Sequence, residues 1–403
     1  TTEIYTLSLH DALPISLDRI FEAIHYLKET GSTVILITHS TAVLKQAEHA
    51  FLLCHGAIVD KGVTSKIMQY FENKCIPCGH KNTLASEELL YMSSNREIAD
   101  QLYEPLQLTD SALRDDETAH LVINHNTVVG THLLPGIVAE VDELENGIRM
   151  LFRVKHGVVI KKPVHLCFGM LPEKGLQEIM LKVEIEKGAR VGVLAHCTFP
   201  NAVDVVHRMD AEIDISEEAH YSYYERHVHG KTGGVTVLPR ARAKLGAGAR
   251  FKTDFDLLRG RVGKIEVDYV TSCADFSVLE MNARINGIMD DLIRIREVGH
   301  LNGEGSRGVL TSRIAVRDNA TAEVYNELTA SAPHAIGHVD CKEIIQDNGV
   351  ATAIPVVKVN HPRAHITHEA AIGSVDSKQL ETLMARGLTE DSAVDLIIQG
   401  LLS

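Results

Sequence analysis

Apolar and polar residues alternate along most of the chain between Arg149 and Val357, and clusters of turn-forming residues interrupt the alternation. Because successive side chains of a strand point to opposite faces, a period of two predicts β-structure. The segments before and after this region show helical spacing instead. The pattern predicts a mainly β protein with helical parts at both ends of its β-region.

The β-region also contains a repeat. Turns that end in an alanine recur at Ala189, Ala219 and Ala249, which are 30 residues apart, and later turns at Ala322 and Ala351 are 29 apart. A period of about 25–30 residues fits one coil of a β-solenoid with two or three strands, in which each coil stacks only on its neighbours. The alternative is a β-sandwich, whose strands would recur every ~8–12 residues. The fixed longer period favours the solenoid.

Two short amphipathic helices are predicted at the C-terminal end, over residues 377–386 and 390–401. Thr389, followed by Glu390 and Asp391, is typical of a helix start, because a capping hydroxyl and early acidic residues satisfy free backbone N–H groups. The apolar stripes of the two helices include Leu380, Leu383, Met384, Val394, Ile397 and Ile398. Such stripes either pack on their own domain or dock a partner.

The first part of the chain alternates helix and strand. Residues 17–27 show helical spacing, residues 33–38 form a β-branched run typical of a buried parallel strand, and residues 50–62 predict a hairpin. Residues 17–73, fewer than sixty in number, are too few to bury their own sheet. Residues 1–16 show no clean period and resemble a translated sequencing adapter, so we set them outside the fold.

Charge and composition exclude several classes of partner. The chain of 403 residues carries 40 Lys and Arg against 54 Asp and Glu, which argues against nucleic-acid binding because phosphate contacts need clustered cations. No apolar run approaches the ~18 residues of a membrane span, so no membrane contact is expected. Seven cysteines spread over this length favour a cytoplasmic location, where thiols stay reduced and can act as ligands.

Four of the cysteines lie in the β-region, and Cys341 has the most polar surroundings. The other three are Cys167, Cys197 and Cys273. A lone strand cysteine is usually a small buried apolar residue. Downstream, His368 and Glu369 are strand neighbours, so only one of them is expected to point inward. Iron accepts thiolate, imidazole and carboxylate, so Cys341 with His368 or Glu369 is a sensible mixed-ligand site. A solvated polar turn is the alternative.

His227 and His229 form a second candidate. They place two imidazoles on one face of a strand beside Glu225, a spacing compatible with metal chelation. The sequence favours the other interpretation, a satisfied cluster on the protein surface.

His39 follows the apolar run of residues 33–38, where the ligands of α/β domains bind. With Ser16–Asp18 as the remnant of a D-loop and residues 54–62 as the closing hairpin, residues 17–73 resemble the C-terminal end of an ABC-type ATPase, particularly the SufC subunit of the SUF iron–sulfur assembly system. His39 matches the switch histidine. The sequence has no Walker-A loop, ABC signature or Walker-B strand upstream, so no ATP hydrolysis by this chain is expected.

Residues 92–403 resemble a SufB/SufD-type scaffold in the short form of minimal two-component SUF systems. The most specific stretches are Cys341–Asn348, Thr367–Asp376 and Gln379–Asp391. The resemblance implies a right-handed parallel β-helix with helical N- and C-terminal parts, in agreement with the repeat. It also implies a scaffold for iron–sulfur cluster assembly rather than an enzyme. A β-solenoid that only couples an ATPase to a partner, without metal, is the alternative function.

The expected organisation combines these parts. The divisions are 1–16, non-native; 17–73, ATPase-like fragment; 74–91, linker; 92–148, N-terminal scaffold region; 149–357, β-helix core; and 358–403, C-terminal helical region. Because the scaffold opens at its own Met92 and the ATPase part is truncated, we interpret the joined arrangement as two neighbouring coding regions read through a lost stop codon.

The resemblance further implies a site and partners. Cys341 falls on the family's interface cysteine, His368 on its interface histidine and Glu369 on the neighbouring glutamate. A nascent iron–sulfur cluster is therefore expected between two scaffold subunits, most simply a homodimer, for transfer to apo iron–sulfur acceptor proteins. ATP is expected to act only through a separate SufC ATPase, which docks on the two C-terminal helices.

One departure from the family concerns sulfur. SufB proteins of larger systems carry a sulfur-accepting cysteine where this chain has Leu245. Sulfur is therefore expected to enter through Cys197, Cys273 or Cys341, or to arrive as free sulfide.

Overall fold

The computed structural model describes residues 117–402 without interruption. Before them it describes residues 4–8, 25–26, 29–30, 33–37, 47–54, 57–64, 67, 95 and 97–106. The chain divides into two compact units, Thr1–Met92 and Ser93–Ser403. No helix in these described ranges is long and apolar enough to cross a membrane.

The first unit contains two small sheets. Strand β1 (Ile4–Ser8) pairs in parallel with β2 (Thr33–Ile37), and β3 (His49–Cys54) pairs antiparallel with β4 (Ala57–Val63). The parallel strand and the hairpin that the sequence predicts are therefore present. β1 lies in residues 1–16, which we set outside the fold because their side chains show no period. Its backbone nevertheless pairs with β2, and backbone hydrogen bonding does not depend on a side-chain pattern. His39 and the D-loop remnant lie outside the described residues.

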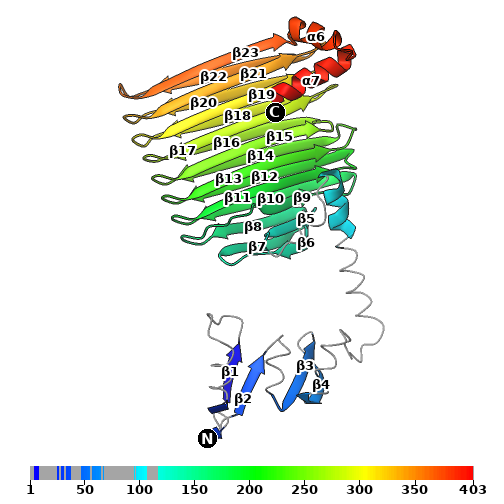
Figure 1. Ribbon diagram of the computed structural model, residues 1–403, viewed down its shortest axis with the longest axis vertical. Helices are drawn as coiled ribbons and strands as arrows, with labels where there is room; N and C mark the ends of the chain where they lie inside the picture. Colours follow the sequence, from blue (N-terminus) through cyan, green and yellow to red (C-terminus); the bar gives the residue numbers. More distant parts are fainter. Residues whose placement is uncertain are drawn as a thin grey trace. The chain divides into compact units, whose positions relative to one another are not determined.

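The second unit is a parallel β-solenoid in which consecutive strands alternate between two sheets (Figure 1). The nine-stranded sheet contains, in spatial order, β7 (Ile137–Leu144), β8 (Gly147–Val154), β10 (Lys174–Ile185), β12 (Asp204–Ile215), β14 (Val235–Leu245), β16 (Lys264–Cys273), β18 (Leu292–Leu301), β20 (Thr321–Ala330) and β22 (Val350–Val359). Each coil contributes one strand to this sheet and one to the other. The predicted solenoid is confirmed, with two strands per coil.

The ten-stranded sheet forms the opposite wall. It contains, in order, β6 (Thr127–His132), β5 (His120–Asn124), β9 (Val164–Gly169), β11 (Arg190–Phe199), β13 (His220–His229), β15 (Arg250–Arg259), β17 (Val278–Gly287), β19 (Arg307–Val316), β21 (Ile336–Ile345) and β23 (His365–Ser374). Neighbouring strands are parallel except for the antiparallel pairs β5–β6 and β7–β8 at the first coils. The last strand, β23, extends the sheet to Ser374.

The first three repeating alanines of the sequence lie in turns between strands, whereas Ala322 and Ala351 lie within β20 and β22. Ala189, Ala219 and Ala249 are fully buried, and the backbone N–H of each donates to the carbonyl three residues earlier, at 3.0–3.2 Å. The residue before each alanine has a positive φ, which Gly188 adopts without strain.

Two helices pack beside the ends of the last strands (Figure 1). They are α6 (Ser377–Met384), capped by Asp376, whose side chain accepts from the Gln379 N–H, and α7 (Glu390–Leu402). The buried face of α7 contacts Ala315 of β19 and Val375. At the other end of the unit, the short 3-10 helix η2 (Glu104–Leu106) buries Leu106 in a small apolar cluster with Cys167.

The last coil, formed by β22 and β23, exposes strand edges and apolar side chains that are covered in the other coils. β22 and β23 each have a neighbour on one side only, so one edge of each strand is unpaired. Their exposed apolar side chains are Val350, Ile354, Val359 and Ile372, at 38–55% exposure. Unpaired, apolar strand edges are sites at which another chain can add.

A buried ion pair fixes one of the turns between coils. Asp291 is 1% exposed and accepts hydrogen bonds from the Arg261 guanidinium, at 2.8 Å from Nη2, and from the backbone N–H groups of Val262, Gly263 and Ile288. Removing one partner of a buried pair leaves the other charge uncompensated.

We therefore predict that Asp291→Ala lowers the free energy of unfolding by about 3 kcal/mol, because Arg261 and three N–H groups lose their acceptor. Asp290→Ala is the matched control: Asp290 contacts the same guanidinium, but its side chain is 85% exposed. Its expected cost is much smaller, because solvent screens an exposed ion pair. Urea unfolding followed by circular dichroism measures both, and equal costs would contradict the assignment.

Candidate functional site

Cys341 lies in the solenoid interior, close to its last coil. It is fully buried on β21, and the Asn326 amide of β20 donates to its Sγ at 3.6 Å. Its in-register neighbour on β19 is Ser312, whose hydroxyl donates to Glu343 Oε1 at 3.3 Å. The thiol therefore sits in a polar pocket made by the inward faces of three adjacent strands.

Two buried carboxyl groups belong to this pocket. Burial raises the pKa of Glu343 to about 7 and that of Glu297 to about 8, and burial also raises the pKa of Cys341. Within residues 117–402, Glu343 Oε2, Glu297 Oε2 and Asn326 Oδ1 have no hydrogen-bond partner. A site with a thiol, protonated carboxyl groups and unsatisfied oxygens can exchange its protons for a metal cation.

His368 and Glu369 lie on opposite faces of β23. His368 is in register with Val339, which shares the inward face with Cys341, whereas Glu369 is in register with Asp340. Glu369 Oε1 lies 3.6 Å from Lys342 Nζ, on the outer face. Both side chains are exposed at the uncovered edge. The structure thus brings His368 to the same face as the thiol and places Glu369 away from it.

The secondary thiols are deeply buried. Burial raises the pKa of Cys273 to about 12 and that of Cys197 well above its ordinary value, so neither is ionised at neutral pH in this conformation. Leu245 is 4% exposed and lies in register with Cys273 of the next coil. A thiol therefore occurs one coil away from the position of the missing cysteine.

The six apolar residues of the C-terminal stripes separate into two groups. Val394 and Ile398 are buried against the solenoid, and Leu380 and Ile397 pack partly against the same cluster. Leu383 is half-buried and Met384 is 41% exposed. Leu396, off the predicted stripe, is 47% exposed. The outward apolar surface is made by Leu383, Met384 and Leu396.

The interpretation of His227 and His229 as a surface cluster was wrong. They are 1% and 6% exposed and point into the solenoid. Odd-numbered residues of β13, from Tyr221 onward, face the core, and this parity carries both imidazoles inward. The parity of a strand is visible in the sequence, but the face that becomes the core is fixed only when two sheets meet.

Sequence reasoning missed three residues of the Cys341 pocket: Glu297, Ser312 and Asn326. Each is a polar residue at an inward position of an otherwise apolar strand face. That interruption is the signal that could have identified them. A buried polar group without a partner destabilises the folded protein, so a polar residue on a core face indicates that it contacts another polar group or a ligand.

Comparison with known proteins identifies the family to which the solenoid unit belongs. Residues 173–401 match the family model described as SUF system FeS cluster assembly, SufBD core domain. An iron–sulfur cluster assembly SufBD family protein of Methanocaldococcus jannaschii is 34% identical over 282 residues, 70% of this chain and 89% of that protein. One of Pyrococcus horikoshii is 33% identical over 293 residues, 73% and 89% of the two chains.

A shorter match is to a different class of protein. An uncharacterized ABC transporter ATP-binding protein of Methanocaldococcus jannaschii is 27% identical over 67 residues, 17% of this chain and 27% of that protein.

The family model covers more than half of the chain, and both SufBD relatives exceed 30% identity over most of their length. The chain therefore belongs to the SufBD family of iron–sulfur cluster assembly proteins.

Proposed function

We propose that the second unit is the scaffold subunit of a SUF-type system and that a nascent iron–sulfur cluster collects on Cys341 with His368 or Glu369. The observation that carries the proposal is the position of Cys341: a buried thiol beside protonated carboxyl groups, one strand from the uncovered edge of the solenoid. The cluster is cargo, built here and passed to apo iron–sulfur acceptor proteins.

A second copy of the chain is the proposed cover for the last coil. Pairing β22 and β23 with another chain would satisfy their free backbone groups and bury the exposed apolar side chains. Ile372 illustrates the need: it is in register with Glu343, on the inward face, yet is 44% exposed. With that face covered, His368 and Cys341 would lie at the interface between two copies.

Because Cys341 is buried, the interface must open before iron and sulfide can reach its thiol. A thiol with a raised pKa binds iron only when a base or the metal removes its proton, and iron and sulfide must first reach it. We propose that a separate SufC-type ATPase docks on α6 and α7 and that its ATP-driven movement opens the interface. The outward surface of Leu383, Met384 and Leu396 is the proposed contact, and Val394 and Ile398 hold the helices on the solenoid. The short match to an ABC transporter ATP-binding protein supports this class of partner.

Sulfur has several proposed routes in this chain. Cys197 and Cys273 are closed to solvent in the present conformation, so a sulfur-relay role for either requires the solenoid to open. Direct delivery of sulfide to Cys341 requires only that the terminal interface open, and we propose it as the main route.

We predict that Cys341→Ser abolishes the cluster chromophore and labile sulfide formed on anaerobic reconstitution with iron, sulfide and a purified SufC-type ATPase, because the thiolate ligand is lost. Cys167→Ser is the control, since Cys167 is an equally buried thiol in another cluster. Normal reconstitution of the Cys341 variant would sink the assignment. A wild-type protein that takes up neither iron nor sulfide would support the metal-free coupling scaffold.

We predict that Met384→Asp weakens binding of the ATPase at least ~10-fold, because a charge enters the centre of an apolar contact. Met289→Asp is the matched control: Met289 is 52% exposed, lies at a turn between β17 and β18, and has a positive φ that Asp tolerates. Isothermal titration with the purified ATPase measures both. Equal affinities would remove α6 from the interface.

We predict that Ile372→Asp shifts the chain from dimer to monomer, because the charge would be buried when the last coils meet. Val309→Asp is the control, an exposed apolar residue of β19, two strands inside the same sheet. Sedimentation velocity distinguishes the two states. A dimer that persists in the Ile372 variant would place the subunit contact elsewhere.

A further inference from the structure

A second cluster of ligand atoms lies inside the solenoid, on β11 and β13. Cys197 and His227 are in-register neighbours of adjacent coils, and Glu225 lies two residues before His227 on the same inward face. One donor atom from each residue lies within 4.8 Å of the others. His227 Nε2 is 2.7 Å from Glu225 Oε1, and Cys197 Sγ is 3.9 Å from the same oxygen. All three residues are at most 1% exposed.

The hydrogen bonds of His227 and His229 leave a lone pair on His227 that faces the Glu225 carboxylate. His229 Nδ1 is 2.9 Å from the Arg261 carbonyl, which only accepts, so Nδ1 carries the proton and His229 Nε2 is an acceptor. His227 Nδ1, 3.3 Å from that Nε2, must then donate. His227 Nε2 is left as a lone pair facing a carboxylate oxygen, and two lone pairs this close need a proton or a cation between them.

A further histidine next to the cluster also has a free lone pair. The Gln177 amide nitrogen donates to the carbonyls of His125 and Gly169, so its oxygen accepts from His207 Nδ1 at 2.9 Å. His207 Nε2 is therefore unprotonated; it is fully buried and has no hydrogen-bond partner in the continuous described part of the chain. The rings of His207 and His227 are 6.0 Å apart. Burial lowers the pKa of His207 well below its ordinary value, which keeps the ring neutral.

We propose that Cys197, Glu225 and His227 hold a resident divalent transition-metal ion of the Fe(II)/Zn(II) class, in a site that lies beside the His207 ring. Thiolate and imidazole select this class of ion, and carboxylate is a common partner to them. The charges balance: one thiolate and one carboxylate neutralise a dication, and both imidazoles are neutral. Binding releases two protons, one from the Cys197 thiol and one from between Glu225 and His227.

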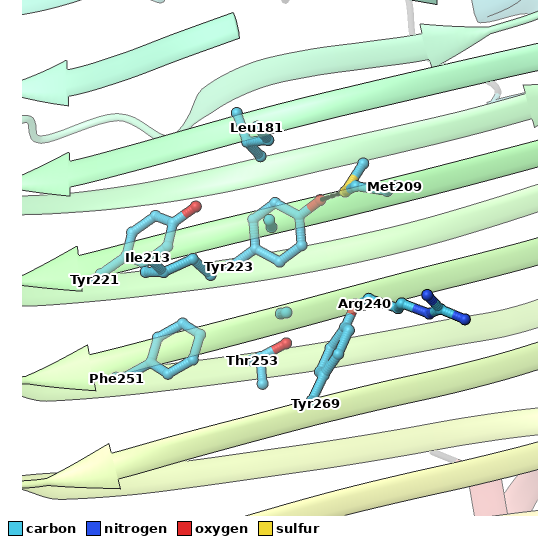
Figure 2. Close-up of a pocket in the computed structure, with 11 residues that line it drawn as sticks. Leu181, Met209, Ile213, Tyr221, Tyr223, Arg240, Phe251, Thr253 and Tyr269 are labelled. Carbon is cyan, nitrogen blue, oxygen red and sulfur yellow. Dashed lines mark hydrogen bonds between the residues drawn. The ribbon is translucent and has the colours of Figure 1, made fainter. Parts of the chain in front are cut away.

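The surroundings seal this site from water. The Tyr269 hydroxyl donates to Glu225 Oε2 at 3.3 Å, and Tyr269 and Tyr223 line an apolar cavity of about 20 Å³, room for about one water molecule. Figure 2 shows these two tyrosines reaching the same interior space from strands of the two sheets. An ion enclosed in this way is taken up as the coils form and exchanges slowly afterwards.

This inference goes beyond the proposed function. The cluster lies on β11 and β13, whereas the Cys341 pocket is built from β18, β19, β20 and β21, and no residue is shared. The ion we propose here stays in the protein and stabilises the solenoid, while the cluster at Cys341 is cargo. The two sites can therefore be tested separately.

The test uses the full chain with Cys341→Ser as the parent, so that cargo metal at the terminal site does not contribute. The protein is refolded anaerobically with Zn(II) or Fe(II) and its bound metal is measured by mass spectrometry after gel filtration. We expect about one ion per chain in the parent and a loss of at least ~80% in Cys197→Ser and in the isosteric Glu225→Gln. Cys273→Ser, another inward buried thiol, should retain the metal.

A spectroscopic readout covers variants that lose stability. Refolding the parent with Co(II) should give a thiolate-to-cobalt charge-transfer band, and Cys197→Ser should lose that band together with most of the bound cobalt. A folded parent that takes up no zinc, iron or cobalt would show that a proton fills the gap and would overturn the proposal. So would equal metal content in the parent and in a folded Cys197 variant.

Discussion

The backbone ladder between successive coils is the constraint on which this structure depends. From β8 to β22 and from β9 to β23, neighbouring strands are parallel, and most of the pairings run in unbroken register. This ladder places each inward side chain on the equivalent side chain of the coil before it. The core is therefore a set of stacked columns, and a residue's environment is decided by the residues about one coil before and after it.

The same register brings together the polar side chains of both candidate sites. Ser312 and Cys341 are 29 residues apart in sequence but adjacent in the sheet, and Cys197 and His227 are 30 apart and also adjacent. Polar groups that alternate with apolar ones on an inward face meet in the dry interior. There burial raises the pKa of Glu297 and Glu343 and lowers the pKa of His207. Such groups can bind a metal cation, because the positive charge of the ion replaces the protons that they lose.

A stack of coils has ends, and each end needs a cover. The first coils are closed by the antiparallel pairs β5–β6 and β7–β8 and by the apolar cluster around Leu102 and Leu106. The last coil has helices only beside its strand ends, and its two edges remain unpaired. This asymmetry leaves one end of the solenoid uncovered, and the polar pocket of Cys341 lies next to that end.

The sequence by itself favoured the solenoid, because turns that recur at a fixed period of about 25–30 residues fit a solenoid coil better than a sandwich with strands every ~8–12 residues. It also determined the strand and hairpin of the first unit, the two C-terminal helices, and the choice of Cys341 as the thiol in polar surroundings. It did not determine which residues share the interior. Glu297 and Asn326 reach the Cys341 pocket from the opposite sheet, and the apolar stripe of α7 turned inward onto Ala315. Strand parity gives two faces but does not name the core, so the histidines of β13 were misplaced until the two sheets were brought together. Their burial, and the lone pair of His227 that faces Glu225, are properties of the tertiary structure alone.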